Sequence, residues 1–504
     1  MITNQSNRIV NLSHLLLSKI INYLDDNIDR IVFTLVCKRW YNDRHRYLSF
    51  KTDHINIIND KHKNNMNLNS YKSIYIDSIN RKNDYHLYIS KYNRRNAEYY
   101  MNSQEQLLQM NEIPPNVNTI SIGSDVKELE EIYQLISRSN VTTMENCKTL
   151  RYRLPENLTS LSFSIDFKDP LFPGYLPPHL KSLKYQNVIF HSKHTIKPGA
   201  LPNTLEYLFF NQSVQNPFEP GVLPSSLKFL SLLNKAVPKV GSLPPNLEEF
   251  KYYSGRHTIE DGVLPLTLQK LTIPGSWLPS IKPLSNLKSL TLLNNEHDVV
   301  DLSYLPCSLT QLYISSGILI PSIPPSIKHL SLIFVIFNSN ADEIFKDHSN
   351  QFDFMFVEKK KIESLYGLNI KELYISMDIN QKLPQIPPSV QKLTISSIQE
   401  DSFLCNITIP NTLQELVIID DYKGYFRVIN FNNDVLPPSL QSLTLPSIQL
   451  PHPLIPNNLV LKSLNTIWLR RLDDHHFLLF SEEPTFISAI VHESDLPIKL
   501  DFFK

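Results

Sequence analysis

A short apolar pattern that recurs about every 22 residues constrains this chain more than any other feature. It consists of an apolar residue, a proline, two variable residues and three apolar positions, as in LPENLTSLSF at 154–163. Such a period over most of a chain predicts stacked repeats rather than one compact core. Copies begin at Ile113, Leu154, Leu176, Leu201, Leu223, Leu243, Leu264, Leu305, Ile323, Ile386, Ile409 and Leu436, and weaker ones are centred on Leu287, Ile370 and Leu464.

The spacing within one copy predicts a short strand. Side chains alternate along a strand, so Leu161 and Phe163 point to one face and Ser162 to the other. The proline precedes the strand, where its missing N–H removes no ladder hydrogen bond. Several copies carry a glycine ahead of the proline, where a positive φ would let the backbone reverse. Parallel stacking then buries the apolar face, with irregular turns rather than helices on the outer side, because the repeat is short.

Two intervals between copies are close to double the usual length, from 117 to 158 and from 327 to 370. Each gap predicts a degenerate unit or an insertion. In the second gap the segment near 335–365 contains FDFMF at 352–356 and three lysines at 359–361. We expect this insert to project as a loop or a helix.

These repeats resemble the FNIP repeat, a leucine-rich-repeat variant of about 22 residues. The resemblance is best from Leu201 to Leu223, where the apolar core is followed by FNQ at 210–212 and NPFEPG at 216–221. It extends over about 113–470 and implies a solenoid of short parallel strands that binds another protein.

The first 40 residues have a helical periodicity instead. Leu12, Leu16 and Ile20 lie four apart, which predicts an amphipathic helix over 12–24. A break at 25–27 separates it from a second helix that starts near Ile28 and ends near Trp40. Repeat arrays need terminal caps, so a small helical cap is one interpretation.

The same segment resembles an F-box, in its leucine-rich first helix and its closing VCKRW at 36–40. Ser13 stands where the usual motif has proline, and the stretch between the helices is about one residue longer than usual. The resemblance implies docking on the Skp adaptor of a Skp–cullin–F-box ubiquitin ligase, with the solenoid capturing a protein substrate. The alternative is a repeat scaffold outside any ligase, in which the helices only cap the solenoid. By position in the motif, the adaptor-facing or motif-core residues would be Leu12, Leu16, Ile20, Leu24, Leu35, Val36 and Trp40.

The sequence therefore predicts an α+β repeat protein with a small N-terminal helical F-box followed by a leucine-rich-repeat-like solenoid. The F-box-like motif covers 8–50, and a linker with an N-terminal cap covers 51–112. The solenoid covers 113–470, with its insert near 335–365, and a C-terminal cap covers 471–504.

Strand positions between the buried leucines would line the concave surface. Most carry small hydroxyl side chains, as at Ser162, Ser231, Thr272, Thr291, Ser331, Thr394 and Thr444. An exposed aromatic group beside lysines is typical of a protein-binding patch, although a register slip of one residue would bury it. The candidates for partner binding are Tyr207, Phe209, Phe229, Lys251 and Tyr313.

Other classes of function receive little support from the sequence. Lysine plus arginine and aspartate plus glutamate number 49 each, so no overall field favours nucleic acid or an anionic membrane. We find no phosphate-binding, nucleophile-elbow or zinc-protease motif and expect no enzyme, cofactor or metal, although an enzyme site in the insert or the C-terminal segment is a rival hypothesis. His475-His476 after Asp473-Asp474 is interpreted as a polar turn, since adjacent strand histidines point oppositely. The absence of a signal segment or a long apolar run predicts a cytoplasmic or nuclear protein.

Overall fold

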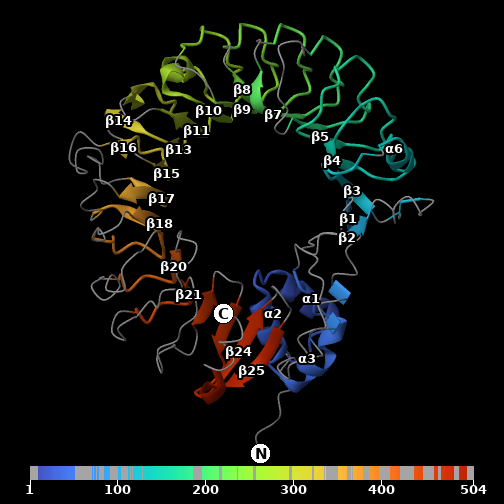
Figure 1. Cartoon of the computed structure of the whole chain (residues 1–504). Helices are drawn as coiled ribbons and strands as arrows, with labels where there is room; N and C mark the ends of the chain where they lie inside the picture. The colour runs from blue at the N-terminus through green and yellow to red at the C-terminus, as the bar shows by residue number, and fades with distance from the viewer. Residues whose placement is uncertain are drawn as a thin grey trace, which may run out of the picture.

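The computed structural model describes residues 10–51, 85–90, 100–103 and, with gaps, 112–496, together with a few positions between 71 and 78. The longer gaps are at 186–195, 337–349, 378–384, 397–408, 420–435 and 446–458, and most of the expected linker at 51–112 lies outside the described residues. The strands follow one another around a ring, and the N-terminal helices lie beside the C-terminal strands where the ring closes (Figure 1).

One sheet runs around the inner side of this ring and contains 22 strands within the described residues. The order begins β2, β1, β3, and neighbouring strands are parallel as far as β22. The pairs β22–β23, β23–β24 and β24–β25 are antiparallel. The first half comprises β1 (Tyr85–Ser90), β2 (Tyr100–Ser103), β3 (Val117–Ile122), β4 (Thr143–Cys147), β5 (Ser160–Phe163), β6 (Ser182–Tyr185), β7 (Tyr207–Val214), β8 (Phe229–Asn234), β9 (Glu249–Tyr252), β10 (Lys270–Pro274) and β11 (Ser289–Leu293). The second half comprises β13 (Gln311–Ile314), β15 (His329–Leu332), β17 (Gln351–Lys359), β18 (Asn369–Met377), β19 (Lys392–Ser396), β20 (Glu415–Ile419), β21 (Ser442–Leu445), β22 (Val460–Ser463), β23 (Ile467–Arg471), β24 (His476–Ser481) and β25 (Ile487–His492).

The three apolar positions of each repeat form the continuous core that the spacing predicts. In the repeat of β5, Leu158, Leu161 and Phe163 are all fully buried. The strand register aligns Leu161 with Leu183 of β6, and the same alignment continues from repeat to repeat. Each buried leucine contributes about 2 kcal/mol of apolar transfer free energy, so the stacked array supplies the stability that no single repeat has.

Glycine has the expected role in the turns on the outer side. Gly174, Gly199, Gly221, Gly241 and Gly262 all adopt a positive φ of 78 to 84°. Space is not the reason for glycine at Gly221, since a Cβ there would meet nothing within 4 Å. The backbone conformation itself, which other L-residues adopt only at a cost, requires glycine.

A ladder of side-chain hydrogen bonds joins successive repeats along one edge of the ring. The residue just before the first core leucine is serine, threonine or asparagine in most copies, and it donates to a backbone carbonyl of the preceding repeat. The shortest contact of each lies between 2.6 and 3.1 Å. The ladder comprises Thr204, Ser226, Asn246, Thr267, Asn286, Ser308, Ser389, Thr412 and Ser439.

Replacing Thr267 of this ladder with valine is expected to lower the free energy of unfolding by about 0.5–1.5 kcal/mol. Its hydroxyl donates to the carbonyls of Leu247 at 2.7 Å and Pro245 at 2.9 Å, and valine keeps the shape without the donor. Urea denaturation followed by circular dichroism measures the change. Thr258→Val is the control, because that exposed hydroxyl makes no hydrogen bond to the described residues. Equal losses in the two variants would contradict a stabilising ladder.

The outer side of the ring is more regular than the irregular turns we expected. Helix α6 (Leu129–Ser137) covers the outside beside β3 and β4 (Figure 1). A 3-10 segment, η2 (Gly275–Ile281), follows β10. A second, three-stranded parallel sheet is formed by β12 (Val299–Asp301), β14 (Gly317–Ile320) and β16 (Val335–Ile336). Helix α6 and β16 lie in the two doubled intervals, whereas η2, β12 and β14 occur in intervals of ordinary length, so the short repeat itself can hold such elements.

Both long gaps between repeats contain a strand of the main sheet. β4 fills the first gap, and β17 fills the second, where it pairs with β15 and β18. Phe352, Met355 and Val357 of β17 are buried, so this part of the expected projecting insert is a degenerate repeat instead. The pattern centred on Leu464 was also misplaced, because β22 is the last parallel strand and Ile467 begins the antiparallel β23.

The chain ends meet through a second apolar core, separate from that of the solenoid. The N-terminal region contains α1 (His14–Asn22), α2 (Asn27–Thr34), α3 (Lys38–Asp43) and η1 (Arg44–Arg46). Leu17, Ile21 and Ile31 of these helices share a buried cluster with Leu478 and Phe480 of β24. Because Phe477 and Leu479 of β24 belong to the solenoid core, β24 is buried on both faces. Within the described ranges, every helix falls short of the length and apolar character that a bilayer-spanning segment requires.

Candidate functional site

The N-terminal helical unit carries several apolar side chains that are exposed to solvent. Leu15 is 79% exposed, Leu16 47%, Ile20 38%, Tyr23 86% and Val36 63%. Since isolated exposed leucines are common but a group on one helical unit is not, these side chains form a candidate contact surface. We call Leu15, Leu16, Ile20, Tyr23 and Val36 the helical patch.

The structure divides the residues predicted from the F-box-like motif into two roles. Leu16, Ile20 and Val36 belong to the helical patch. Leu12, Leu24 and Leu35 are half-buried, and Leu12 and Leu24 pack against the core at the junction of the chain ends. Trp40 is buried in that core, where its indole stacks on Phe33 at 4.6 Å. The sequence did not single out Leu15 and Tyr23, although their neighbours at 16 and 20 suggested an apolar face.

Local capping explains two unusual features of the motif. Ser13, which replaces the usual proline, caps α1 because its hydroxyl accepts from the Leu16 N–H at 3.4 Å. The predicted second helix is two helices, since α2 ends at Thr34 and Cys37 caps α3 through a sulfur contact with the Trp40 N–H. The Trp40 Nε1–H donates to the Val10 carbonyl at 3.1 Å, which places the chain ahead of α1.

Ion pairs and aromatic contacts reinforce the docking of the helices on the C-terminal sheet. Lys462 of β22 pairs with Asp26 at 2.9 Å, and Arg470 of β23 pairs with Asp29. Phe480 stacks on Phe50 with ring centroids 6.3 Å apart. These groups are partly buried, so their attraction is screened less than that of surface pairs. The helices are thus part of the ring rather than a freely attached unit.

An aromatic pair on the concave side occupies the place where the sequence predicted a binding patch. Tyr207 of β7 and Phe229 of β8 are ladder neighbours and stack with ring centroids 4.0 Å apart. The ammonium of Lys184 lies 5.7 Å from the Tyr207 ring, and that of Lys251 lies 5.3 Å from the Phe229 ring, within cation–π range. Both rings are half-buried and accessible. We call these four residues the concave patch.

Charges within the concave patch are balanced locally. Burial opposes the charged form of Lys251, but its hydrogen bond with Glu249 raises the pKa, so the ammonium is retained. Lys251 and Glu249 are 3.0 Å apart. Burial raises the pKa of Tyr207, which therefore keeps its phenolic proton and can donate a hydrogen bond to a partner.

The small strand residues that we expected to line an exposed surface are mostly buried. Ser231 is inaccessible, and Ser162, Thr272, Ser331 and Thr394 are also buried. Ser231 lies in the ladder between Phe209 and Lys251, so larger neighbours flank it on both sides. Small and large side chains thus occupy neighbouring positions on the concave side. The large side chains cover the small ones and form the accessible surface.

The remaining predicted concave residues do not join the concave patch in one cluster. Phe209 is half-buried beside Lys184 in the ladder, whereas Tyr313 is several strands away on β13. Sequence analysis missed a second aromatic contact, Phe356 of β17 with Tyr374 of β18 at 4.8 Å. It was missed because β17 was not recognised as a strand.

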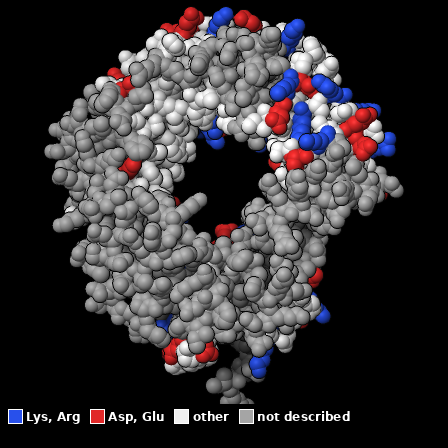
Figure 2. Space-filling view, in the orientation of Figure 1, with Lys and Arg blue, Asp and Glu red and all other residues white. Residues whose placement is uncertain are grey.

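Charge is mixed over the described surface. In the space-filling view, acidic and basic side chains are intermingled along the upper and upper-right rim, and the centre of the ring is open (Figure 2). A polar groove of about 760 Å³ crosses several repeats at the edge that carries the hydrogen-bond ladder. Glu206, Lys228, Glu248 and Lys288 line it, and Lys228 pairs with Glu206 at 3.3 Å. Alternating signs give this groove no preference for an anion or a cation.

Parallel strands on the inner side of a ring, with a leucine core and short outer turns, define a leucine-rich-repeat solenoid. Residues 148–185 and 193–235 match the family described as FNIP Repeat. These two segments contain β5 to β8 and are similar to FNIP repeats. No curated protein sequence matches it.

Solved structures with similar folds were also found. The chain is 18% identical to CroV588, described as a novel circular leucine-rich-repeat protein, covering 72% of this chain and 67% of that one at a TM-score of 0.33. YopM from Yersinia enterocolitica is 18% identical, covering 66% of this chain and 60% of that one, at a TM-score of 0.28. A chain of the Toll–Spatzle complex of Drosophila is 15% identical, covering 65% of this chain and 53% of that one, at a TM-score of 0.29. The chain thus spans less than two thirds of the last two proteins.

Proposed function

We propose that this chain is a substrate-receptor subunit of a Skp–cullin–F-box ubiquitin ligase. Its N-terminal helices would dock on the Skp adaptor, and its solenoid would hold a protein substrate. The observation that carries the proposal is the helical patch, whose apolar side chains stay accessible although other residues of the same helices are buried in the core at the chain ends. An unpartnered apolar surface on a short helical motif suits a hydrophobic contact with another protein.

The resemblance to an F-box and the burial pattern support the same division of roles. Leu16, Ile20 and Val36 belong to the F-box-like motif and are accessible for an adaptor. Trp40 belongs to it as well but holds the helices together. A receptor needs a rigid connection between its adaptor-binding and substrate-binding parts, and the shared apolar core with β24 would provide one.

The concave patch supports substrate capture. Stacked aromatic rings offer a large contact area with little entropy to lose, and the flanking ammonium groups would attract acidic or carbonyl groups of a partner. We therefore infer that the substrate contacts Tyr207 and Phe229 and carries acidic residues beside an apolar anchor.

A second candidate function is a repeat scaffold in which the N-terminal helices act only as a cap. The favouring observation is the buried cluster that the helices form with Leu478 and Phe480 of the C-terminal sheet. Both functions accommodate that contact. They differ in whether the helical patch binds an adaptor.

Replacing Leu16 with aspartate is expected to weaken binding of a purified Skp adaptor at least tenfold, because a charge would enter an apolar contact. Biolayer interferometry with the intact chain measures the affinity. Leu16 is accessible, so the fold is retained, which circular dichroism checks. Leu266→Asp is the matched control, since Leu266 is 61% exposed on the solenoid and far from the helices.

Two outcomes would count against the ligase role. Wild-type protein that fails to bind the adaptor at micromolar concentration would leave the scaffold function. Equal weakening by Leu16→Asp and Leu266→Asp would mean that adaptor binding does not use the helical patch.

A further inference from the structure

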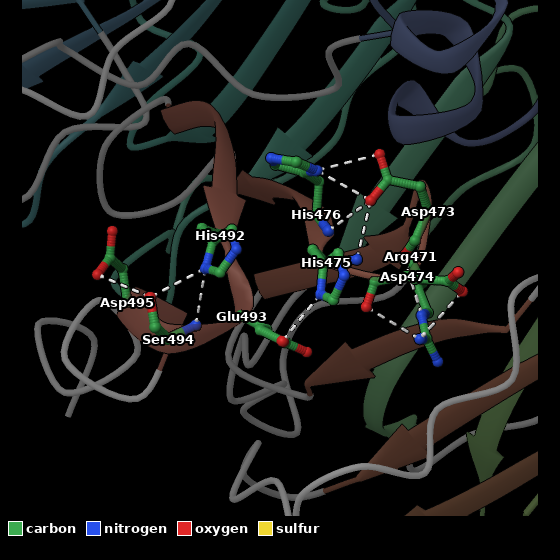
Figure 3. Close-up of polar contacts among 9 residues, drawn as sticks. All are labelled: Arg471, Asp473, Asp474, His475, His476, His492, Glu493, Ser494 and Asp495. Atoms are coloured by element: carbon green, nitrogen blue, oxygen red, sulfur yellow. Dashed lines mark hydrogen bonds and ion pairs between the residues drawn. The ribbon is translucent and has the colours of Figure 1, made fainter.

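Three potential metal ligands converge at one end of the C-terminal sheet. His475 lies in the turn before β24, His492 ends β25 and Glu493 begins the following 3-10 turn, η5 (Glu493–Asp495). One ligand atom from each lies within 4.8 Å of the other two. Figure 3 shows the side chains of His475 and Glu493 turned toward each other, with the His492 ring beside them.

The backbone around these ligands is fixed by hydrogen bonds. The Glu493 N–H donates to the His475 carbonyl at 2.8 Å, so the two residues are held opposite each other. The Asp473 carboxylate accepts from the N–H groups of His475 and His476, at 2.9 and 2.8 Å, and closes the turn. In the β24–β25 ladder, His476 and His492 are partners. A ligand set on two strands and a closed turn has little backbone entropy left to lose.

Neighbouring side chains keep the cluster distinct from the acidic turn. His476 Nδ1 lies 2.9 Å from an Asp473 oxygen, so His476 is turned away from His475 (Figure 3). Arg471 donates to the carbonyls of Asp473 and Asp474, which neutralises that side of the turn. His492 Nδ1 accepts from the Ser494 N–H at 3.3 Å and lies 2.9 Å from the Ser494 hydroxyl, so the start of η5 orients this ring.

Contacts among the three ligands are near the spacing that a small cation requires. His475 Nδ1 and Glu493 Oε1 are 3.0 Å apart, and the His475 and His492 rings lie 5.8 Å apart at 15°. Ligand atoms at about 2.0–2.1 Å from a tetrahedral zinc ion are separated by about 3.3 Å. Since the two histidines are exposed and Glu493 is half-buried, rotation of these side chains can bring all three to one ion.

We propose that His475, His492 and Glu493 form a binding site for a divalent transition-metal ion of the zinc class. Two imidazoles and one carboxylate suit zinc, cobalt or nickel, whereas magnesium and calcium prefer oxygen ligands alone. Three protein ligands leave a fourth position for water or for a group from a partner. Binding would join the turn after β23 to the end of β25, and so would stabilise the sheet on which the N-terminal helices dock.

Titration of the full-length protein with zinc, by competition with a chromophoric chelator after treatment with EDTA, tests the site. His475→Ala and His492→Ala are each expected to bind zinc at least tenfold more weakly than the wild type, and Glu493→Gln less tightly than the wild type. His476→Ala is the matched control, because His476 lies in the same turn but outside the ligand set, and it should bind as the wild type does.

Cobalt provides a second readout that does not depend on affinity. A site with two imidazoles should give cobalt visible absorption bands that are absent in His492→Ala and retained in His476→Ala. Zinc should also raise the thermal midpoint of the wild type but not of His492→Ala. Zinc affinity unchanged in His492→Ala, or an equal loss in His476→Ala, would overturn the proposal and show weak surface binding only.

Discussion

Replacing Phe480 with alanine is expected to release the N-terminal helices from the C-terminal sheet, with a loss of about 3–5 kcal/mol of stabilising free energy. Phe480 is 1% exposed and lies in the buried cluster with Leu17, Ile21 and Ile31. Its ring contacts Phe50 on one side and Trp468 on the other, with centroids 6.3 and 5.5 Å apart. Removing the ring leaves a cavity between the chain ends that helices and strands cannot both close.

Hydrogen–deuterium exchange can measure the release of the N-terminal helices separately from the rest of the ring. Amides of α1 and α2 are expected to lose protection in Phe480→Ala, while β5 to β11 keep theirs, because these strands belong to the separate solenoid core. Phe172→Ala is the control, since Phe172 is 40% exposed on the outer side. Retained protection of α1 and α2 in Phe480→Ala would mean that the helices are stable without the C-terminal sheet.

Most of the solenoid could be predicted because the residue pattern within each repeat determines the local backbone geometry. A proline, a glycine with positive φ and three apolar positions fix where each strand starts and which face is buried. A serine, threonine or asparagine also precedes the first leucine in most copies, but the ladder it forms was not predicted, because it depends on a carbonyl of the preceding repeat that lies 2.7 Å from Ser226 and from Thr267.

The parts that escaped prediction lack a periodic signal. β4 and β17 have no proline ahead of them, so the sequence left open a degenerate unit or an insertion in each gap, and the segment that contains β17 was interpreted as a projecting loop or helix. The run FLLF at 477–480 contains the signal for two-sided burial, because an alternating strand would carry polar residues on one face. It does not say which segment covers the second face. That partner is the N-terminal helical unit, whose Leu17, Ile21 and Ile31 lie more than 400 residues away in the sequence.

The sequence indicated which kinds of residue belong to the candidate sites, but not which of those residues are accessible or lie together. Apolar residues such as Leu16 and Trp40 share the same motif, and only the packing of the helices against one another and against the C-terminal sheet decides which is accessible and which is buried. His475 was considered with its neighbour His476, yet the strand pairing places His492 and Glu493 beside it instead. Pairings between distant strands, which no local pattern records, determine both results.

Replacing Trp277 with alanine is expected to lower the free energy of unfolding of the surrounding repeats by about 3–5 kcal/mol. Trp277 lies in η2, is fully buried and stacks on Tyr252 of β9 with ring centroids 4.6 Å apart. Its Nε1–H donates to the His257 carbonyl at 2.7 Å. The indole thus fills the core and joins η2 to β9 and to the outer segment at His257.

Urea denaturation, followed by both circular dichroism and hydrogen–deuterium exchange of β9, β10 and β11, measures this loss. Trp277→Phe is the matched variant, because phenylalanine keeps an aromatic ring against Tyr252 but cannot donate to His257. It should cost less than Trp277→Ala, since most of the apolar volume remains. A loss below about 1 kcal/mol in Trp277→Ala would show that the outer segments hold their positions without the indole, and that the leucine core alone sets the stability of these repeats.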